Sequence, residues 1–396
     1  MADAHDSGSD ELAAYLALAA VPGIGVARLR ALLGAFVTAR SVLAAPPGAV
    51  AAVPGIGRAA AAAIRAVSAA AGARVLAALD RLGARVLVPT DPEFPPLLRE
   101  IPEPPAVLFA WGDVSVLSRP AAALVGSRDH TAYGAEAARL LAAGVARAGA
   151  VVVSGMARGV DALAHTAALD AGGTSVGVLG NGFGVVYPAA NRALYGRMVA
   201  HGCLVTELPP GERPRAHTFP RRNRLIAGLA RATVVVEARP DSGAVITADA
   251  ALDQGRAVLA VPGPITSVTS LGCNRLIQQG AKPCLGPGDI LEEMGMQREP
   301  GAGSRTLPGG SESPAAPEST APGSRLPPAD LSPLQLALWP SLASAPRHVD
   351  DLAGAAAAEA GEVLVALTDL EMRGLVRQGA GMRFSVNAEF GMGNAE

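Results

Sequence analysis

The sequence predicts an α/β protein built on an extended Rossmann-like, mostly parallel sheet, and three observations support this fold class. Short apolar runs rich in β-branched residues recur through the middle of the chain. They are continuously apolar, which is typical of strands covered on both faces. Most of the later runs alternate with helical stretches, as a parallel sheet requires. The expected strands are 85–88, 106–112, 121–126, 151–155, 175–180, 204–208, 233–238 and 257–263, all within a domain spanning 73–296.

Residues 1–72 predict a separate helical domain. The sequence AAVPGIG occurs from Ala19 and again from Ala51, each time between two helical runs. This repeat is typical of a SAM-like helix-hairpin-helix unit, whose glycines permit a tight turn with exposed amides. Such amides can hold a phosphate, or the hairpins can simply pack as a small bundle. Both alternatives stay open, because this part carries five arginines against four acids.

The C-terminal third predicts a linker followed by a winged helix. Residues 297–328 form the expected disordered linker, because 17 of the 29 residues in 300–328 are Pro, Gly or Ser. Residues 329–396 predict three helices and a hairpin, with nine acids against four arginines. A net charge of −5 would repel a polyanion. We therefore expect this domain to contact protein or to be autoregulatory rather than to bind DNA.

Composition excludes several classes of protein. A net charge of −2 argues against a generally basic nucleic-acid coat protein but permits a local anion site. Three cysteines without a CxxC pair indicate free thiols in a reducing cytoplasm. No signal peptide is evident, and no apolar stretch of spanning length is free of Gly, Pro or charge. We expect a soluble, cytoplasmic protein without membrane insertion.

Cofactor motifs are absent from the sequence. No GxGxxG follows the first core strand, and a Walker A motif is excluded because the only lysine is Lys282. The histidines are scattered, which predicts no metal site. His165 lies four residues after Asp161, so the two could act as a base and its orienting carboxylate. Since no nucleophile is evident, we favour hydrogen bonds that shape the start of a helix, and we expect no catalytic residue and no cofactor.

The loops after the expected strands are suited to phosphate recognition. In parallel sheets, ligands bind beyond the carboxyl ends of the strands. Hydroxyls, amides and arginines there can hold phosphate without a metal, and two of these loops lead into helix N-termini. Ser242 is also expected to be an N-cap. The expected ligand contacts in these loops are Ser127, Arg128, Ser154, Gly155, Arg158, Ser242 and Gly243.

The stretch HTFPRRNRLIAGLA, residues 217–230, places positive charge at the start of a helix. Six arginines and no carboxylate occur in 213–231. An aromatic ring beside phosphate-binding arginines is what a single-stranded nucleic-acid site requires. Alternatively, the ring packs at the helix start and the arginines are solvated or pair with Glu207 and Glu212. We favour the first interpretation, in which the contacts are Phe219, Arg221, Arg222, Asn223 and Arg224.

Six blocks occur in order within the segment from about Arg74 to Glu293, which is 220 residues long. They are VGSR (125–128), SGMARGVDALAH (154–165), YPAAN (187–191), FPRRNRLIAGL (219–229), VEARPDSGAVITADAAL (236–252), and VPG with GCNRLIQQGA (261–263, 272–281). This series resembles the DNA-processing protein A family, also called DprA or Smf. The helical N-terminal domain and the winged helix agree with the layout of that family.

The resemblance implies a non-catalytic protein that binds and protects single-stranded DNA. It also implies that the protein assists loading of the RecA recombinase in natural transformation and homologous recombination. Arg128, Arg221 and Arg158 would hold phosphates and Phe219 would stack on a base. Arg222 is assigned to the variable position of the family's FPxRN block.

The resemblance further implies a homodimer formed through the Rossmann-like domain. Its expected edge, near the surface that RecA would use, is the helix holding Leu276, Ile277 and Gln278.

Two other functions stay open at this point. A nucleotide phosphoribohydrolase of the LOG-like type would use a PGGxGT block followed by a catalytic Glu, whereas the comparable segment here reads PDSGAVITADAA. Release of base from nucleoside monophosphates would identify that enzyme. A duplex-DNA protein led by the hairpin repeat is the other alternative. Competition between single-stranded and duplex oligonucleotides would distinguish it.

Overall fold

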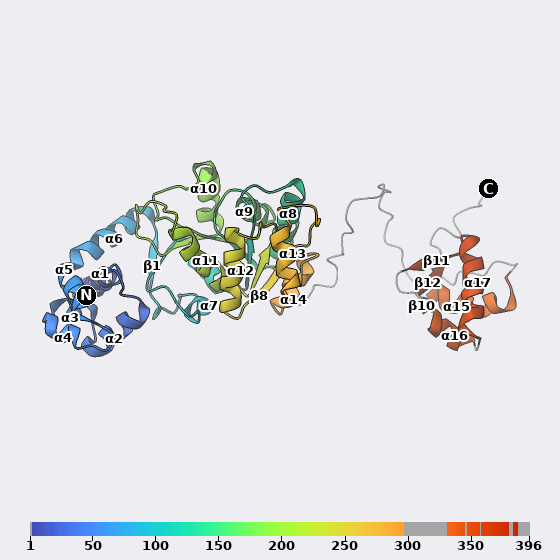
Figure 1. The fold of residues 1–396 in the computed structure, drawn as a ribbon, viewed down its shortest axis with the longest axis horizontal. Coiled ribbons are helices and arrows are strands. Elements are labelled where there is room, and N and C mark those ends of the chain that lie inside the picture. Colours follow the sequence, from blue (N-terminus) through green and yellow to red (C-terminus); the bar gives the residue numbers. More distant parts are fainter. Residues whose placement is uncertain (1, 297–330, 345–346, 357, 380–382, 387–396) are drawn as a thin grey trace. The chain divides into compact units, whose positions relative to one another are not determined.

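The computed structural model describes two compact units, and each is presented by itself (Figure 1). The expected linker, residues 297–328, lies outside the described residues. The described residues are 2–296, 331–344, 347–356, 358–379 and 383–386.

The first unit begins with a bundle of helices. Gly23 and Gly55 have φ of 82° and 80°, a left-handed conformation that glycine adopts without strain, so each PGIG segment can turn between two helices. Helix α6 runs through the expected boundary at residue 72 and packs on α1, so we place the boundary at Gly83 instead. The helices are α1 (Ala2–Ala19), α2 (Val26–Phe36), α3 (Ala39–Ala44), α4 (Pro47–Ala51), α5 (Arg58–Ala66) and α6 (Ala69–Leu82).

A nine-stranded sheet follows, in the order β1-β2-β6-β5-β4-β3-β7-β8-β9. Strands β1 and β2 pair antiparallel at one edge, and the strands from β6 to β9 are parallel. The predicted fold class and all eight expected strands are confirmed, and β9 is an addition. The strands are β1 (Arg85–Leu87), β2 (Leu108–Gly112), β3 (Ala121–Val125), β4 (Val151–Ser154), β5 (Ser175–Val178), β6 (Cys203–Thr206), β7 (Ala232–Val235), β8 (Ala257–Ala260) and β9 (Lys282–Pro283).

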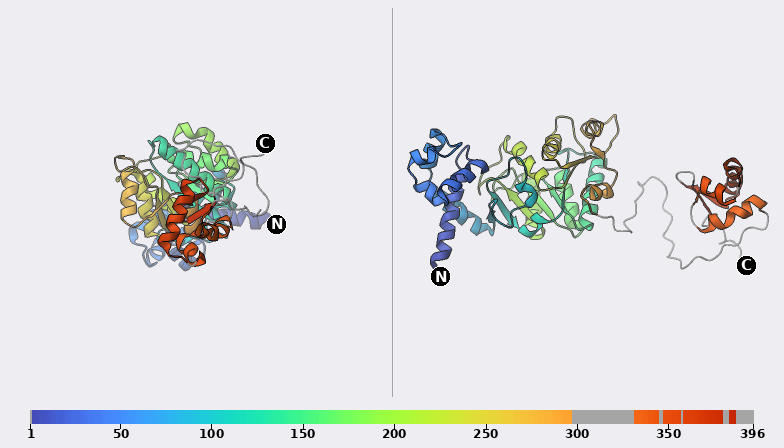
Figure 2. Two further views of the ribbon diagram at one scale, coloured as in Figure 1. Left: turned by 90° about the vertical axis from the view of Figure 1, so that its right-hand side faces the viewer. Right: turned by 90° about the horizontal axis from the view of Figure 1, so that it is seen from below.

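Helices cover both faces of the sheet (Figures 1 and 2). On β3, Ala123 and Val125 face the core that includes α11 and α12, whereas Ala122 and Leu124 face the core that includes α8 and α9. This division explains why the strand is apolar at every position. The remaining elements are α7 (Pro96–Arg99), η1 (Val114–Ser118), α8 (Ala132–Arg147), α9 (Val160–Asp170), η2 (Ala189–Asn191), α10 (Arg192–His201), α11 (Thr218–Gly228), α12 (Gly243–Asp253), α13 (Leu271–Gln278) and α14 (Pro287–Glu293).

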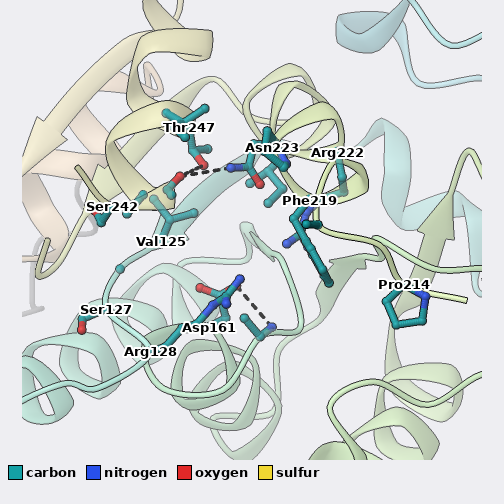
Figure 3. A pocket seen from close by; sticks show the side chains of 18 of the residues that line it. Val125, Ser127, Arg128, Asp161, Pro214, Phe219, Arg222, Asn223, Ser242 and Thr247 are labelled. Carbon is teal, nitrogen blue, oxygen red and sulfur yellow. Dashed lines mark hydrogen bonds between the residues drawn. The ribbon is translucent and has the colours of Figure 1, made fainter. Parts of the chain in front are cut away.

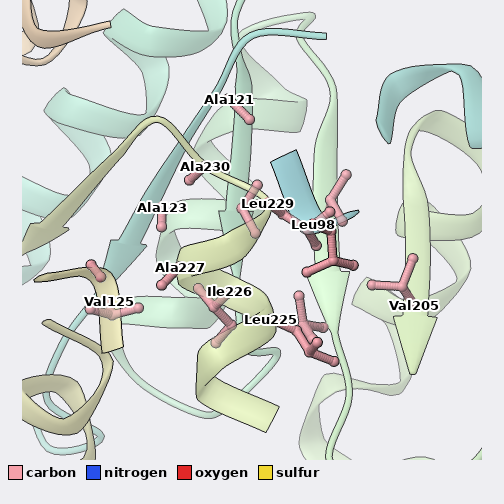
Figure 4. Packing of buried hydrophobic residues seen from close by; sticks show 14 of the residues in the cluster. Leu98, Ala121, Ala123, Val125, Val205, Leu225, Ile226, Ala227, Leu229 and Ala230 are labelled. Carbon is pink, nitrogen blue, oxygen red and sulfur yellow. The ribbon is translucent and has the colours of Figure 1, made fainter. Parts of the chain in front are cut away.

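Helix α11 is anchored by the apolar half of the basic stretch. Leu225, Ile226 and Ala227 are at most 1% exposed and pack in the same core as Val125 and Val205 (Figure 4). Burying side chains as large as Leu225 and Ile226 contributes about 1.5–3 kcal/mol each. The polar N-terminal half of the helix is therefore held at the carboxyl edge of the sheet.

The second unit is a winged helix with its own core, which includes Trp339, Leu367 and Phe384. The three helices and the hairpin expected from sequence are present, and β10 adds a short third strand to the order β10-β12-β11. The elements are α15 (Pro333–Ser344), β10 (Arg347–His348), α16 (Val349–Ala356), α17 (Ala360–Met372), β11 (Val376–Gly379) and β12 (Arg383–Val386).

Among the described residues, no individual helix has the length and apolarity needed to cross a membrane. The bent pair α5 and α6, with 60° between them, meets that test of length and composition together.

Candidate nucleic-acid interface

A pocket of about 760 Å³ lies at the carboxyl ends of the parallel strands. The chain runs from β3 outward to β6 and then returns to the other side of β3 with β7, so the loops after β3 and β7 diverge. This topological switch point is where open α/β sheets bind ligands. We call this cavity the switch-point pocket (Figure 3). It is lined by the loop 125–129, the start of α11 and the start of α12.

Two aromatic rings and an arginine form one wall of the switch-point pocket. The Phe219 ring projects from the first turn of α11 into the pocket (Figure 3). Its centroid is 5.7 Å from the guanidinium carbon of Arg128 and 5.6 Å from the centroid of the Tyr187 ring. Gly180 makes this position possible, since a Cβ there would be 2.8 Å from the Phe219 ring. Arg128 and Phe219, both expected to contact the ligand, therefore lie together in this wall.

The start of α12 forms the opposite wall. Ser242 and Gly243 line the pocket, and Asn223 Nδ2 donates to the carbonyl of Gly243 at 3.0 Å. Asn223 therefore fixes α11 against α12 and is 7% exposed. Ser242 is the N-cap residue of α12, as expected from the sequence, but its buried Oγ has no hydrogen-bond partner and does not cap the helix amides. The first-turn amides of α12 are left without a side-chain cap.

Arg222 does not have the exposed role expected from the sequence. It is 6% exposed, and its guanidinium donates to the carbonyls of Gly155 and Val178 beneath the pocket. Burial lowers the pKa of Arg222 to about 10. The order Phe219-Pro220-Arg221-Arg222-Asn223 also places the arginine of FPxRN on Arg222 and the variable position on Arg221, so our sequence-based assignment was wrong.

Arg221 and Arg224 lie away from the switch-point pocket. Arg221 is exposed, with its Nε 3.9 Å from Glu207 Oε2, and it lines two neighbouring cavities. Arg224 is bonded to Glu207 and donates to the carbonyl of Glu103 at 2.6 Å. For Arg224, pairing with Glu207 is the alternative that the structure favours. Helix geometry explains the difference, because successive residues on α11 face different directions.

The loop after β4 contributes less than the sequence predicts. Ser154 is fully buried, and its Oγ donates to the carbonyl of Leu124 at 2.6 Å, so it is not available to a ligand. Gly155 is buried and lines an adjoining cavity of about 340 Å³ together with Arg158. Arg158 is exposed and lies 3.1 Å from Asp129 Oδ1. Within this loop, Arg158 is the side chain best placed to reach a ligand.

Asp161 and His165 shape this loop, as the non-catalytic interpretation predicts. Asp161 accepts from the amides of Gly155 and Ala157, and His165 Nε2 accepts from the amide of Met156. Burial raises the pKa of Asp161, although Arg222 opposes this shift. Burial, assisted by Arg222, lowers the pKa of His165 to about 3, which keeps its ring neutral.

Three residues that the sequence analysis missed also line the pocket: Tyr187, Arg215 and Arg239. Arg239 and Arg128 are exposed and have no salt bridge among the residues that the structure describes. Arg215 is 3.1 Å from Glu212. The sequence contained signals for all three. Tyr187 begins the YPAAN block, Arg215 lies in the arginine-rich run 213–231, and Arg239 lies in the loop after β7. Together with Ser127 and the α12 amides, these cations can hold phosphates while the rings stack on a base.

The proposed dimer helix presents only part of the expected surface. Leu276 is 4% exposed and belongs to the core, so it is not available for a partner. Ile277 is partly buried and Gln278 is exposed. Within the described part of the chain, no three His, Cys, Asp or Glu side chains are grouped to hold a metal ion.

Comparison with known proteins identifies the family. A model described as DNA recombination-mediator protein A matches residues 85–295, more than half of the chain. The chain belongs to this family, known as DprA or Smf. A DprA winged helix domain matches 320–382, and a SAM-like helix-hairpin-helix tandem matches 15–67. Both flanking domains predicted from sequence are therefore confirmed.

Individual relatives agree with this assignment. Protein Smf of Synechocystis is 35% identical over 312 residues, which covers 75% of this chain and 78% of that protein. DNA processing protein DprA of Bacillus subtilis is 43% identical over 203 residues, covering 51% and 68% of the two chains. The crystal structure of DprA from Streptococcus pneumoniae matches with a TM-score of 0.63 at 32% identity, covering 71% of this chain and 97% of that one.

Proposed function

We propose that this protein binds single-stranded DNA in the switch-point pocket and acts as a non-catalytic mediator of recombination. The observation that supports this most strongly is that the Arg128 guanidinium lies beside the Phe219 ring in the lining of the pocket. The start of α12, whose amides have no side-chain cap, lines the same pocket. A strand in single-stranded form exposes both a base face and a phosphate, which such a pair can bind together. In a duplex, the base faces are stacked and unavailable.

The carboxylates near the pocket support binding rather than hydrolysis. Of the two carboxylates that line the pocket, Asp161 is held by loop amides and Asp129 lies 3.1 Å from Arg158. Glu237, which is outside the lining, accepts from Thr131 and Thr269. The Thr131 hydroxyl, which donates to Glu237, also accepts from the amide of Gly134 and so caps α8. The phosphoribohydrolase alternative gains no support from these contacts.

Replacing Arg128 tests the proposal directly. We expect Arg128→Ala to weaken binding to oligothymidylate by about tenfold or more, because it removes a charge-assisted bond to a phosphate. The log–log slope of affinity against salt should fall by about 0.7 for each phosphate that the variant no longer neutralises. Arg139→Ala is the matched control, since Arg139 is exposed and does not line the pocket. Unchanged affinity in a folded Arg128→Ala protein would exclude the assignment.

We also propose that the protein acts in the cytoplasm, protects incoming strands during natural transformation and assists the loading of RecA. Loading can be tested by strand exchange with RecA on DNA precoated with single-stranded-DNA-binding protein. Stimulation by the wild type and its loss in Arg128→Ala would support this role. Absence of stimulation at saturating protein would contradict it.

A homodimer is proposed at the sheet edge that carries α13. Ile265, before α13, is 86% exposed, and Leu285, after β9, is 78% exposed. Two large apolar side chains at an edge of short strands favour a protein contact. Light scattering after gel filtration should give a dimer for the wild type and a monomer for Ile265→Asp/Leu285→Asp. A monomeric wild type would contradict the proposal.

A further inference from the structure

A second pocket lies between the N-terminal helices and the edge of the sheet. It has a volume of about 590 Å³, and we call it the junction pocket. One side is the turn between α1 and α2, and the other is formed by the segment 102–107, β2 and the outer face of α11. Its walls therefore come from two domains within one compact unit.

The junction pocket combines an apolar interior with arginines. Arg30 is exposed and has no side-chain hydrogen bond or salt bridge among the described residues. Arg221 is 67% exposed and lies 3.9 Å from Glu207. Arg224 and Glu207 are bonded to each other in the wall, so their charges offset. An interior of this kind suits a base, and cations on its lining suit the adjacent phosphates. The apolar lining includes Leu16, Ile24, Val107 and Phe109.

The turn that leads into α2 adds backbone amides, whose partial charge is positive and favours a phosphate. Gly25, Val26 and Ala27 line the pocket at the start of this 11-residue helix. No side chain caps α2, and no acid lies in its first turn. The first-turn amides therefore carry unbalanced positive partial charge, which favours an anion and supplements Arg30 and Arg221.

A hollow of about 90 Å³ shares lining residues with both pockets. The hollow shares Arg215 and Arg222 with the switch-point pocket, and Arg221 and Glu207 with the junction pocket. Helix α11 lies beneath all three cavities, with Phe219 lining the switch-point pocket. Two acids along this route, Glu207 and Glu212, are each paired with an arginine. A third, Glu103, lines the junction pocket with an exposed side chain that has no salt bridge among the described residues, so Arg30 and Arg221 must outweigh its charge.

We propose that the junction pocket is a second nucleotide subsite, which takes a base of the same DNA strand that occupies the switch-point pocket. This inference rests on the proposed function, because it requires single-stranded DNA in the first pocket. Arg221 and Arg30 hold phosphates of the continuing strand, and the apolar interior receives the base. Arg221, which the switch-point pocket leaves unused, has a ligand in this arrangement.

The test compares two oligothymidylates, of about 5 and about 20 nucleotides, since single-stranded sites commonly cover a few to some sixteen nucleotides. The variants are Arg30→Ala and Ala27→Glu, which remove a cation and add an anion at exposed positions of α2. Their matched controls are Arg65→Ala on α5 and Ala35→Glu at the other end of α2, both at exposed positions that do not line the pocket. Affinities are measured by fluorescence anisotropy on the full chain, and folding is checked by thermal melting.

The expected result is a loss confined to the longer strand. Each variant should weaken binding of the long oligonucleotide by about tenfold, leave the short one unchanged, and reduce the salt slope only for the long one. Abasic sites through the second half of the long strand should reduce wild-type affinity, because the apolar interior then has no base to receive while the phosphates remain.

Equal affinities of variants and controls for the long strand would overturn the second subsite, as would equal losses on both strands. Full affinity for the abasic strand would overturn the insertion of a base. If Arg128→Ala binds both strands like the wild type, the proposed function itself fails. That outcome differs from a failure of the junction pocket alone, in which Arg128→Ala still loses affinity for both strands.

Discussion

Arg128 and Phe219 are 91 positions apart in the sequence, yet the guanidinium carbon of one lies 5.7 Å from the ring centroid of the other. Parallel strands bring them together: Arg128 follows β3, and Phe219 begins the helix that precedes β7, the neighbour of β3. A cation beside an aromatic ring holds both side chains in a preferred geometry before any ligand arrives. A strand bound there would contact the two as a unit.

This pairing predicts that the two side chains contribute non-additively to binding. Phe219→Leu should cost about 1–3 kcal/mol of affinity for single-stranded DNA, because the ring that stacks on a base is removed. In a double-mutant cycle with Arg128→Ala, the loss of binding free energy in the double variant should differ from the sum of the two single losses by about 0.5–1 kcal/mol. Fluorescence anisotropy at one fixed salt concentration gives all four affinities. Strict additivity would show that the two residues bind independently.

Arg221 and Arg222 are adjacent in the chain but should differ in what they stabilise. Arg222→Met leaves the carbonyls of Gly155 and Val178 without a donor inside the protein. The free energy of unfolding should fall by about 2–5 kcal/mol. Arg221→Ala, at an exposed position, should change it by less than about 0.5 kcal/mol. Urea denaturation of both variants measures the difference, and equal effects would contradict the buried role of Arg222.

Stability should decrease on mild acidification because of His165. The pKa of this side chain is about 3 in the folded protein, against an ordinary value of 6.5. Between these values the unfolded chain binds a proton that the folded chain excludes. Its contribution to stability is therefore present above pH 6.5 and is lost as the pH falls towards 3, by up to about 1.4 kcal/mol per pH unit. The raised pKa of Asp161 acts in the opposite sense and offsets part of the loss at the acid end.

Replacement of His165 by Gln isolates this contribution. Urea midpoints between pH 7 and 5 should decline for the wild type and remain flatter for His165→Gln, whatever its absolute stability. A wild-type profile as flat as that of the variant would mean that His165 is protonated without cost in the fold.

The sequence was sufficient to predict the sheet, because its strands are apolar at every position and separated by helical stretches. It also predicted Arg128 and Phe219 as ligand contacts, the first in the loop after a core strand and the second at the start of a helix. It could not decide between Arg221, Arg222 and Arg224. Those side chains leave α11 in different directions, and burial depends on which cavity each one faces.

Other errors have the same physical origin. Ser154 and Leu276 lie in segments that the site was expected to use, but their side chains point into the core. Arg239 and Tyr187 were missed although both lie in sequence blocks already noted, because the sequence does not show which side chains of a loop face the pocket. The sequence shows that a residue lies in a loop near the site. Whether its side chain is accessible to a ligand depends on tertiary packing, which the sequence does not show.

The winged helix gives a prediction about the partner of the second unit. Helix α17 occupies the position of a recognition helix, and Val365 and Met372 on it are 72% and 84% exposed. Glu362 and Asp369 are exposed on the same helix. Apolar side chains among acids favour contact with a protein and oppose contact with phosphates. The folded unit from residue 329 onward should therefore show no binding to duplex or single-stranded DNA at physiological salt.

Removing this unit from the full chain extends the prediction. A chain that ends at residue 296 should keep the oligothymidylate affinity of the full chain within about threefold, because the arginines of the switch-point pocket all precede that residue.

Lowering the salt concentration should not create DNA binding by the isolated unit, since its net charge repels phosphates more strongly when screening is weak. Anisotropy titrations at two salt concentrations measure this directly. Binding that strengthens at low salt would mean that Arg347, Arg377 or Arg383 forms a local cationic surface that outweighs the nine acids.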